Sequence, residues 1–305
     1  MLQTIQIPQL RSSIANYYAL TKPKIWYLLV FTAFGAMIAA PQGGLNVPPI
    51  LAVLVVGSVT MGSAGANVLT CYLDRDMDAI MERTKHRPIP AGKIAPYRAL
   101  QFGLLLTTLS IAGALTIDSF IGYPLVSVIM ALGIFDNVIV YSAFLKRRTI
   151  WNIILGGFSG GAPALIGYAA VTGTINLEAI LIFSLVFLWI PAHIWSLSLK
   201  YKADYAKVGV PMLPVVLSER TSIRIIAASS LLIVTFSLAL YLVGGFGYLY
   251  LLTASLTGSA VVILGLQLVA KPSEEKAWKL FKFTSPYLTL LFLAMIVEGV
   301  FQSLI

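Results

Sequence analysis

Nine long apolar runs constrain the fold of this chain more than any other feature of its sequence. An α-helix needs roughly 20 apolar residues to cross about 30 Å of hydrocarbon, and each run is near that length. A soluble helical protein would need a polar face on each surface helix, which a chain that is 58% hydrophobic does not supply. We therefore expect an all-α polytopic membrane protein, a single bundle of nine transmembrane helices. The expected spans are residues 24–41, 49–73, 98–117, 121–144, 150–171, 177–199, 222–244, 247–269 and 283–304.

The 21 lysines and arginines all lie in alternate segments outside these spans or within the first three residues of an adjoining span. The other four connecting loops, near residues 42–48, 118–120, 172–176 and 245–246, contain none. By the positive-inside rule the charged segments are cytoplasmic, which puts the N-terminus inside and the C-terminus outside. The net charge of +9 is then explained by topology, and we expect no nucleic-acid partner.

No break in composition marks a second domain. We therefore expect a cytoplasmic N-terminal arm over residues 1–21 and a single nine-helix domain over residues 22–305, inserted in the lipid bilayer of the cell (plasma) membrane. The lone cysteine, Cys71, excludes an internal disulfide and a multi-cysteine metal site.

The most polar stretch of the chain follows the second span. Charged residues make up 11% of the sequence, yet eight of them fall between Asp74 and Arg87. A helix turns about 100° per residue, so Asp74 and Asp78 share a face, Asn67 lies close to that face, and Asp76 points away. Mg²⁺ in proteins is usually held by one or two carboxylates together with substrate phosphates. The pattern predicts a divalent-cation site on Asp74, Asp78 and Asn67.

A second polar cluster ends the sixth span. His193, Lys200 and Asp204 have the spacing of one helical stripe that leads toward the same side as Asp74. An ionisable residue within a span is a functional hypothesis by default. The alternative for His193 is an interhelical hydrogen bond beside the kink expected at Pro191.

An acidic and a basic cluster on one side of a bundle favour a cavity for a diphosphate with Mg²⁺, and the apolar bundle behind them offers room for a hydrocarbon tail. A cation transporter could use the same aspartates, but it would carry more ionisable residues near the bilayer midplane. Those deep in spans are chiefly Asp136 and Glu298, for which we favour packing roles.

The glycines at 156–157 and 160–161 favour close helix packing, or alternatively a thin wall beside a ligand cavity.

At this point the sequence resembles a known family. The run from Asp74 (Asp-Arg-Asp-Met-Asp) through Arg87-Pro-Ile-Pro is similar to the first aspartate-rich motif of UbiA-type intramembrane prenyltransferases. More narrowly, it resembles the protohaem IX farnesyltransferase (haem O synthase) branch. Pro191-Ala-His-Ile-Trp-Ser-Leu-Ser-Leu-Lys-Tyr-Lys-Ala-Asp-Tyr, followed by residues through Pro214, is similar to the second signature of that branch.

The resemblance implies farnesyl transfer from farnesyl diphosphate to a vinyl group of haem b, giving haem O and diphosphate, with Mg²⁺ as cofactor. It also implies a haem A synthase or oxidase assembly factors as partners, and the charge pattern places the active site of this multi-pass protein on the cytoplasmic side. A sibling prenyltransferase acting on an aromatic acid, quinone precursor or glycerol phosphate is the alternative. The implied catalytic residues are Asp74, Asp78, His193, Lys200 and Asp204, and the implied substrate-binding residues are Asn67, Arg75, Arg83, Lys85, Arg87, Tyr201, Lys202 and Tyr205.

Two positions depart from the expected pattern. Many relatives carry Asn four residues before the first Asp, where this chain has Thr70, so Asn67 must supply any amide ligand. The second motif of the wider superfamily is rich in aspartate, whereas here Lys200 stands four residues before Asp204. The second departure fits the haem-modifying branch better than the quinone-precursor branches.

Overall fold

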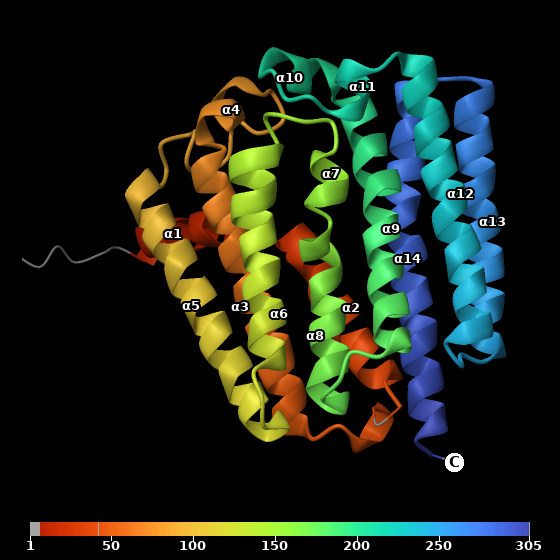
Figure 1. Cartoon of the computed structure of the whole chain (residues 1–305). Helices are drawn as coiled ribbons and strands as arrows, with labels where there is room; N and C mark the ends of the chain where they lie inside the picture. The colour runs from red at the N-terminus through yellow and green to blue at the C-terminus, as the bar shows by residue number, and fades with distance from the viewer. Residues whose placement is uncertain (1–6, 42, 305) are drawn as a thin grey trace, which may run out of the picture.

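Long apolar helices lie side by side and connect two ends of the molecule (Figure 1). The computed structural model describes residues 7–41 and 43–304, and within these ranges it contains helices and no strand. The long elements are α1 (Ile7–Leu20), α2 (Pro23–Ala39), α3 (Pro49–Leu73), α5 (Pro96–Ile121), α6 (Leu125–Phe135), η2 (Asp136–Leu145), α8 (Phe158–Thr172), α9 (Leu177–Lys200), α12 (Glu219–Val243), α13 (Tyr248–Ala270) and α14 (Glu274–Gln302). The short ones are η1 (Gly44–Asn46), α4 (Arg75–Ile80), α7 (Asn152–Leu155), α10 (Lys202–Lys207) and α11 (Leu213–Val216).

Eight of the nine expected spans are helical stretches long and apolar enough to cross a membrane, judged by length and composition over the described residues. The expected first span is α2, which has 17 residues and is the shortest. The expected last span begins nine residues early, at Glu274 rather than at residue 283. The Ser273 side chain accepts the Lys276 backbone N–H at 3.2 Å, and this N-cap starts the helix within the charged segment.

The fourth and fifth spans are irregular, which the apolar pattern did not predict. The fourth continues from α6 into η2, a π-helix over Asp136–Leu145. The fifth is divided by Gly156 and Gly157 into α7 and α8. π-Helical segments are rare and are found most often at functional sites. Both irregularities border the candidate site described below.

Small residues allow α2 to pack closely against α8. A Cβ atom added at Gly167 would lie 1.9 Å from the carbonyl oxygen of Ala33, so no larger residue fits at this crossing. In lipid the hydrophobic effect does not drive helices together, and van der Waals packing at such close approaches does. The crossing holds α2 against the side of the bundle that contains the site.

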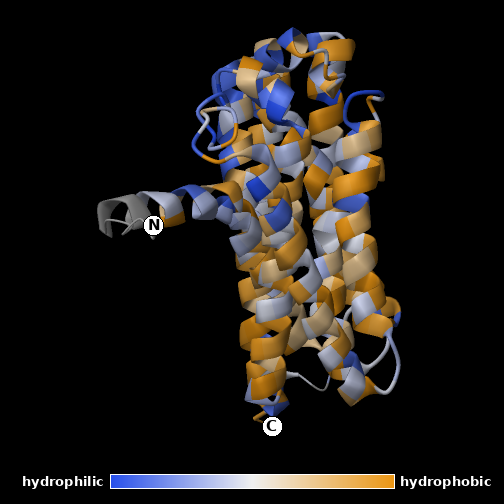
Figure 2. Ribbon diagram, turned by 90° about the vertical axis from the view of Figure 1, so that its left-hand side faces the viewer, coloured by the Kyte–Doolittle hydropathy of each residue, from blue (hydrophilic) through white to orange (hydrophobic). Residues whose placement is uncertain are grey.

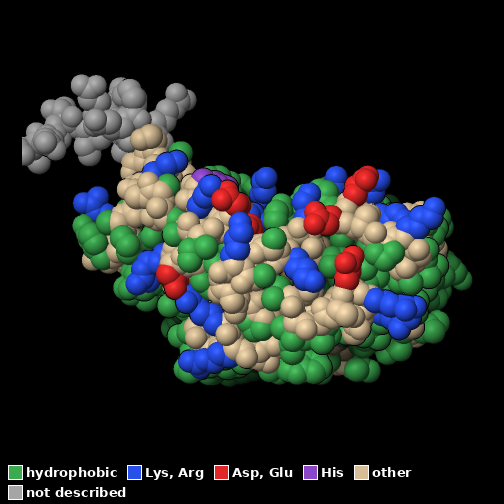
Figure 3. Space-filling model, turned by 90° about the horizontal axis from the view of Figure 1, so that it is seen from above, with side chains coloured by type: hydrophobic (Ala, Val, Ile, Leu, Met, Phe, Trp, Pro, Cys, Tyr) green, Lys and Arg blue, Asp and Glu red, His purple; other side chains and the backbone are tan. Residues whose placement is uncertain are grey.

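Charge is concentrated at one end of the bundle. The short helices α4, α10 and α11 lie at this end, and the C-terminus of α14 lies at the opposite end (Figure 1). Hydrophobic residues cover the length of the helices, whereas hydrophilic ones gather around the charged end (Figure 2). Viewed from that end, Lys and Arg side chains are spread across the face with a few Asp and Glu between them (Figure 3). Helix α1 projects sideways from the bundle (Figure 2); residues 1–6 of the expected arm lie outside the described residues.

Candidate functional site

A cavity opens among the helices near the charged end. We call it the central cavity; its empty volume, open mouth included, is about 1520 Å³. Its polar lining residues are Lys22, Lys24, Asn67, Thr70, Asp74, Asp78, Arg83, Arg87, Asn137, Tyr141, Ser142, Lys146, Ser159, His193, Tyr205 and Ser285. Apolar side chains from α2, α4, α7 and α9 complete the wall, among them Leu29, Met77, Ile153 and Ile190. The cavity therefore combines a strongly charged end with an apolar interior.

The two aspartates reach this cavity through a break in the helix. Helix α3 ends at Leu73, Asp74 lies between the helices with φ −89° and ψ 2°, and α4 begins at Arg75. The Asp78 backbone N–H donates to the Asp74 carbonyl at 2.8 Å, which continues the helical path across the break. Both carboxylates are buried, and both line the central cavity together with Asn67.

Asp78 forms an ion pair with Arg87. Arg87 Nη1 donates to both carboxylate oxygens, at 2.9 Å to Oδ1 and 2.7 Å to Oδ2. Arg83 and Arg87 do not lie on a helix, because residues 81–95 form successive turns after α4 ends. These turns fold the segment back over the aspartates, which brings Arg87 onto Asp78.

Asp74 forms an ion pair with Lys146, the residue that follows η2. Lys146 Nζ lies 2.5 Å from Asp74 Oδ2. Burial alone would lower the pKa of the Lys146 ammonium, but Asp74 and Tyr141 raise that pKa above its usual value. Asp74 Oδ1 is buried without a hydrogen-bond partner within the described part of the chain. One carboxylate oxygen is thus neutralised, and the other is available to a ligand.

Lys22 is held at the cavity by an unusual backbone. Its φ of 53° and ψ of 62° lie in the left-handed region, and it is the one non-glycine residue with positive φ among those described. Pro23 disfavours the right-handed helical conformation at the residue before it. Lys22 Nζ donates to Thr70 Oγ1 at 2.8 Å, and Thr70 donates in turn to the Asn67 carbonyl at 2.9 Å. Strained backbone of this kind is found preferentially at functional sites.

The charge of Lys22 has no carboxylate partner within the described ranges, where the ion pairs involve other cations. Burial lowers the pKa of its ammonium below the usual value, and Arg87 and Lys146 lower it further, whereas Cys71 and Asp74 raise it. Such a lysine is suited to receive an anionic ligand, since a phosphate oxygen would supply the missing counter-charge.

The second motif joins the site through Arg83 and Tyr205. Arg83 Nη2 donates to the Tyr205 hydroxyl at 3.4 Å, and the Arg83 guanidinium carbon lies 5.4 Å from the centre of the Tyr201 ring. Asp204 Oδ2 accepts the Arg83 backbone N–H at 3.2 Å. Asp204 and Tyr201 do not line the central cavity. Asp204 instead fixes the segment after α4 against α10.

The expected single stripe of His193, Lys200 and Asp204 is wrong, because α9 ends at Lys200 and Tyr201 leaves the helical conformation with φ −104° and ψ 29°. Lys200 Nζ lies 4.3 Å from the centre of the Trp278 ring, outside the cavity lining. Lys202 is exposed. The structure therefore does not bring these two lysines to the aspartates.

Two basic residues of the first motif also point elsewhere. Arg75 is exposed and stacks over the Tyr72 ring at 4.5 Å, and its Nη1 donates to the Tyr72 carbonyl at 2.6 Å. Lys85 is exposed and forms an ion pair with Glu82 at 2.5 Å. Neither residue lines the central cavity.

His193 lines the cavity between two aromatic rings. Its imidazole stacks against Trp189 and Phe281, with ring centres 4.3 and 4.2 Å away. Thr284 Oγ1 donates its hydrogen to the Phe281 carbonyl at 2.8 Å, so it must accept from His193 Nδ1, which lies 2.7 Å away. In the neutral imidazole this assignment places the proton on Nδ1 and leaves Nε2 with a lone pair. The hydrogen bond expected as the alternative is present, and the residue also lines the cavity.

Asp136 and Glu298, the deepest ionisable residues considered from the sequence, lie outside the cavity lining. Asp136 Oδ2 accepts the Ser159 backbone N–H at 2.9 Å. Glu298 accepts the backbone N–H groups of Gly247 and Tyr250 at 2.7 and 2.9 Å, at the start of α13. Both carboxylates therefore connect helices, as their expected packing roles require.

The glycines of the fifth span border the cavity as well as packing against neighbours. Gly156 and Gly160 line the central cavity. A Cβ atom at Gly160 would approach Ile190 Cδ1 to 2.4 Å. The packing and thin-wall interpretations therefore both hold for this segment.

Sequence reasoning missed Lys22, Lys146, Tyr141 and Asn137 as lining residues. Lys22 and Lys146 were assigned only to charged segments that set topology. The one available signal was that both follow or precede an apolar span on the same side as Asp74. Which span ends are neighbours depends on the packing of the bundle.

The residues on the cavity wall suit a hard divalent cation. Asp74 Oδ1 lacks a hydrogen-bond partner among the described residues, and carboxylate and amide oxygens of the kind that Asp74, Asp78 and Asn67 carry are ligands that Mg²⁺ prefers. Among the described residues no group of three or more His, Cys, Asp or Glu forms a complete metal site. A cation here would thus need further oxygens from a bound substrate, which is the usual arrangement for Mg²⁺ with phosphates.

Comparison with known proteins decides the family. The model of the UbiA prenyltransferase family matches residues 28–296. The chain belongs to the UbiA prenyltransferase family. It is accordingly a membrane-embedded transferase enzyme. Protoheme IX farnesyltransferase 2 of Cenarchaeum symbiosum is 47% identical over 97% of this chain and 99% of that protein. Protoheme IX farnesyltransferase of Desulforudis audaxviator is 45% identical over 95% of this chain and 90% of its own length.

Solved structures of UbiA prenyltransferases share the fold. A digeranylgeranylglyceryl phosphate synthase structure superimposes with a TM-score of 0.75 and 22% identity, covering 95% of this chain and 99% of that one. A UbiA homologue from Archaeoglobus fulgidus bound to GPP and Mg²⁺ superimposes with a TM-score of 0.67 and 16% identity, covering 92% and 99%. At these identities the agreement establishes the UbiA fold alone.

Proposed function

We propose that this UbiA prenyltransferase transfers the farnesyl group of farnesyl diphosphate to a vinyl group of haem b, giving haem O and diphosphate. The observation that carries prenyl transfer is the central cavity, which joins a cationic, carboxylate-bearing end to an apolar interior. The choice of haem b as acceptor is supported by the relatives at 39–47% identity that are protoheme IX farnesyltransferases.

The diphosphate would bind at the charged end. Lys22, Arg83, Arg87 and Lys146 all line this end of the cavity. Among the described residues, Arg83 has a buried Nε without a hydrogen-bond partner, and Lys22 forms no ion pair with a carboxylate. Cations at this position would stabilise the negative charge that grows on the leaving diphosphate. Of the residues expected from the sequence, Arg75, Lys85, Lys200 and Lys202 have no part in this proposal.

Asp74, Asp78 and Asn67 would hold Mg²⁺ against the diphosphate. Support comes from the free Asp74 Oδ1 and from the Mg²⁺-bound UbiA homologues of the same fold. When bound, the ion would supply Lewis-acid neutralisation of the phosphate oxygens. Lys146 pairs with Asp74 and Arg87 pairs with Asp78, and both aspartates line the central cavity.

The haem would lie toward α9. His193 and Trp189 line that wall, and the fixed tautomer of His193 leaves its Nε2 lone pair for an acceptor role or for iron.

The reaction balances with one water molecule. The bond from farnesyl C1 to the diphosphate oxygen breaks, and its electron pair leaves with the diphosphate. The π electrons of the haem vinyl group form the new carbon–carbon bond to C1. Water adds to the resulting cation and loses a proton, which leaves a hydroxyethylfarnesyl substituent. The apolar wall around Ile190 and Leu29 would exclude water until the vinyl group has attacked.

The membrane arrangement follows the charge pattern. We propose that α2 is a ninth span and that residues 22–305 form one domain of the plasma membrane. The N-terminus and the active site would face the cytoplasm, and the C-terminus would face outside. The gathering of Lys and Arg at the end with α4 and α10 supports this orientation (Figure 3). A haem A synthase or an oxidase assembly factor would be the partner that receives the product.

An acceptor screen tests the proposal. Purified protein in lipid nanodiscs receives farnesyl diphosphate and Mg²⁺ with haem b, an aromatic acid or glycerol phosphate in turn. The expected result is farnesylation of haem b, detected by mass. If an aromatic acid or glycerol phosphate is prenylated and haem b is not, the proposed function is wrong and the protein is a sibling prenyltransferase.

A further inference from the structure

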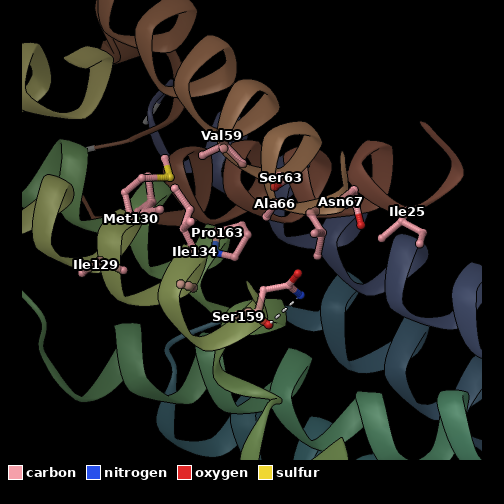
Figure 4. Close-up of a pocket in the computed structure, with 16 residues that line it drawn as sticks. Ile25, Val59, Ser63, Ala66, Asn67, Ile129, Met130, Ile134, Ser159 and Pro163 are labelled. Carbon is pink, nitrogen blue, oxygen red and sulfur yellow. Dashed lines mark hydrogen bonds between the residues drawn. The ribbon is translucent and has the colours of Figure 1, made fainter. Parts of the chain in front are cut away.

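A second, smaller cavity lies beside the central cavity, between α2, α3, α6 and α8 (Figure 4). We call it the apolar lobe; its empty volume is about 480 Å³. Asn67, Asn137 and Ser159 line both spaces, so they form a shared mouth. A ligand seated in the central cavity therefore has a route into the apolar lobe.

The lobe changes character with depth. At the mouth Asn137 Nδ2 donates to Ser159 Oγ at 3.4 Å, the contact drawn in Figure 4. Beyond the mouth the lining is almost entirely apolar, with Val59, Ile129 and Ile134 among the side chains. Val59 lies eight residues from Asn67 along α3, which is about 12 Å of helix. None of the described lining residues is charged.

The lobe is narrow because glycines bring its walls together. A Cβ atom at Gly62 would lie 2.7 Å from Met130 Sδ. One at Gly133 would lie 3.1 Å from the Ala162 Cβ. Met130 belongs to α6 and is buried, and its sulfur faces Gly62 of α3 at this depth. The lobe suits a flexible hydrocarbon chain, whereas a rigid porphyrin needs the width of the central cavity.

We propose that the apolar lobe receives the far end of the prenyl chain and that Met130 limits the chain length of the donor. This inference rests on the proposed function, in that the donor is an allylic diphosphate with its charged end near Asp74. A chain anchored there enters past Asn67 and ends against Met130, so the side chain at position 130 determines how many isoprene units fit.

The test compares geranyl, farnesyl and geranylgeranyl diphosphates as donors to haem b. Met130→Ala deepens the lobe and should raise the ratio of kcat/KM for geranylgeranyl over farnesyl diphosphate about tenfold. Ser63→Leu, from the half-buried lining of α3, shortens the lobe and should shift preference toward geranyl diphosphate. Leu132→Ala is the matched control, since Leu132 is on the same helix and 50% exposed on its outer side.

Opposite shifts in the two variants, with an unchanged ratio in Leu132→Ala, support the inference. Wild-type ratios in both folded variants would overturn it while leaving the proposed function intact. If the wild-type protein transfers no prenyl group from any of the three donors, the proposed function fails and this inference fails with it. Ser63→Leu retains the test if Met130→Ala does not fold.

Discussion

Lys146 Nζ lies 2.5 Å from Asp74 Oδ2, which joins the end of η2 to the end of α3 across 72 positions of sequence. Asp74 Oδ1 is buried and has no hydrogen-bond partner in the part of the chain that the structure describes, and Asp74 lines the central cavity. Asp74 thus has one carboxylate oxygen paired with Lys146, and we propose that the other binds a ligand. The Lys146 ammonium supplies the counter-charge that a buried carboxylate needs.

Asp74→Asn should lower kcat by about 100- to 1,000-fold, since it removes an electrostatic contact on which the diphosphate depends. The amide is isosteric, so the protein should remain inserted, with a lower temperature of thermal unfolding because the buried Lys146 loses its counter-charge. Asp76→Asn is the matched control, because the Asp76 side chain is 60% exposed and pairs with Arg147 at the surface. Comparable loss of turnover in both variants would contradict the assignment of Asp74.

Arg87→Met should raise KM for farnesyl diphosphate about 10- to 100-fold, the equivalent of one charge-assisted hydrogen bond. Arg87→Lys should give a smaller rise, because an ammonium keeps the charge but not the bidentate geometry on Asp78. Steady-state kinetics with varied donor measures both. Lys85→Met, which removes an exposed charge, should leave KM unchanged, and an equal effect there would mean that only net charge matters.

Lys22 should determine part of the alkaline limit of activity. Burial lowers the pKa of its ammonium, so the folded free enzyme loses this proton at a lower pH than an unperturbed lysine does. Affinity for the anionic donor should therefore fall as pH rises toward the ordinary lysine range. In Lys22→Arg the charge persists, and the alkaline limb of kcat/KM for the donor should move to higher pH. An unchanged limb would show that another group titrates there.

Thr284→Val should weaken haem b binding about tenfold or more, because it removes the hydroxyl that fixes the tautomer of His193. The measurement is an absorption titration with haem b in the absence of donor. Donor affinity serves as the internal control, since Thr284 does not line the charged end of the cavity. Loss of donor and haem affinity together would indicate a general packing defect at α14.

The helices and the acidic site were largely predictable, because apolar run length and a dense charge cluster are local properties of the sequence. Asp74, Asp78 and Asn67 meet at one cavity even though the helix breaks at Asp74. Lys22 and Lys146 were not predictable, since their roles depend on which span ends pack together. The prediction that Lys200 faces the site was wrong because α9 ends at this residue. The sequence has no glycine or proline at position 201 that would have indicated the helix end.

The most direct measurement incubates the purified protein in nanodiscs with farnesyl diphosphate and haem b, with Mg²⁺ present or chelated, and analyses the haem by mass spectrometry. We predict a haem heavier by one farnesyl group and one hydroxyl group, formed when Mg²⁺ is present and lost on chelation. Haem of unchanged mass, beside a different acceptor that has gained the prenyl group, would contradict it.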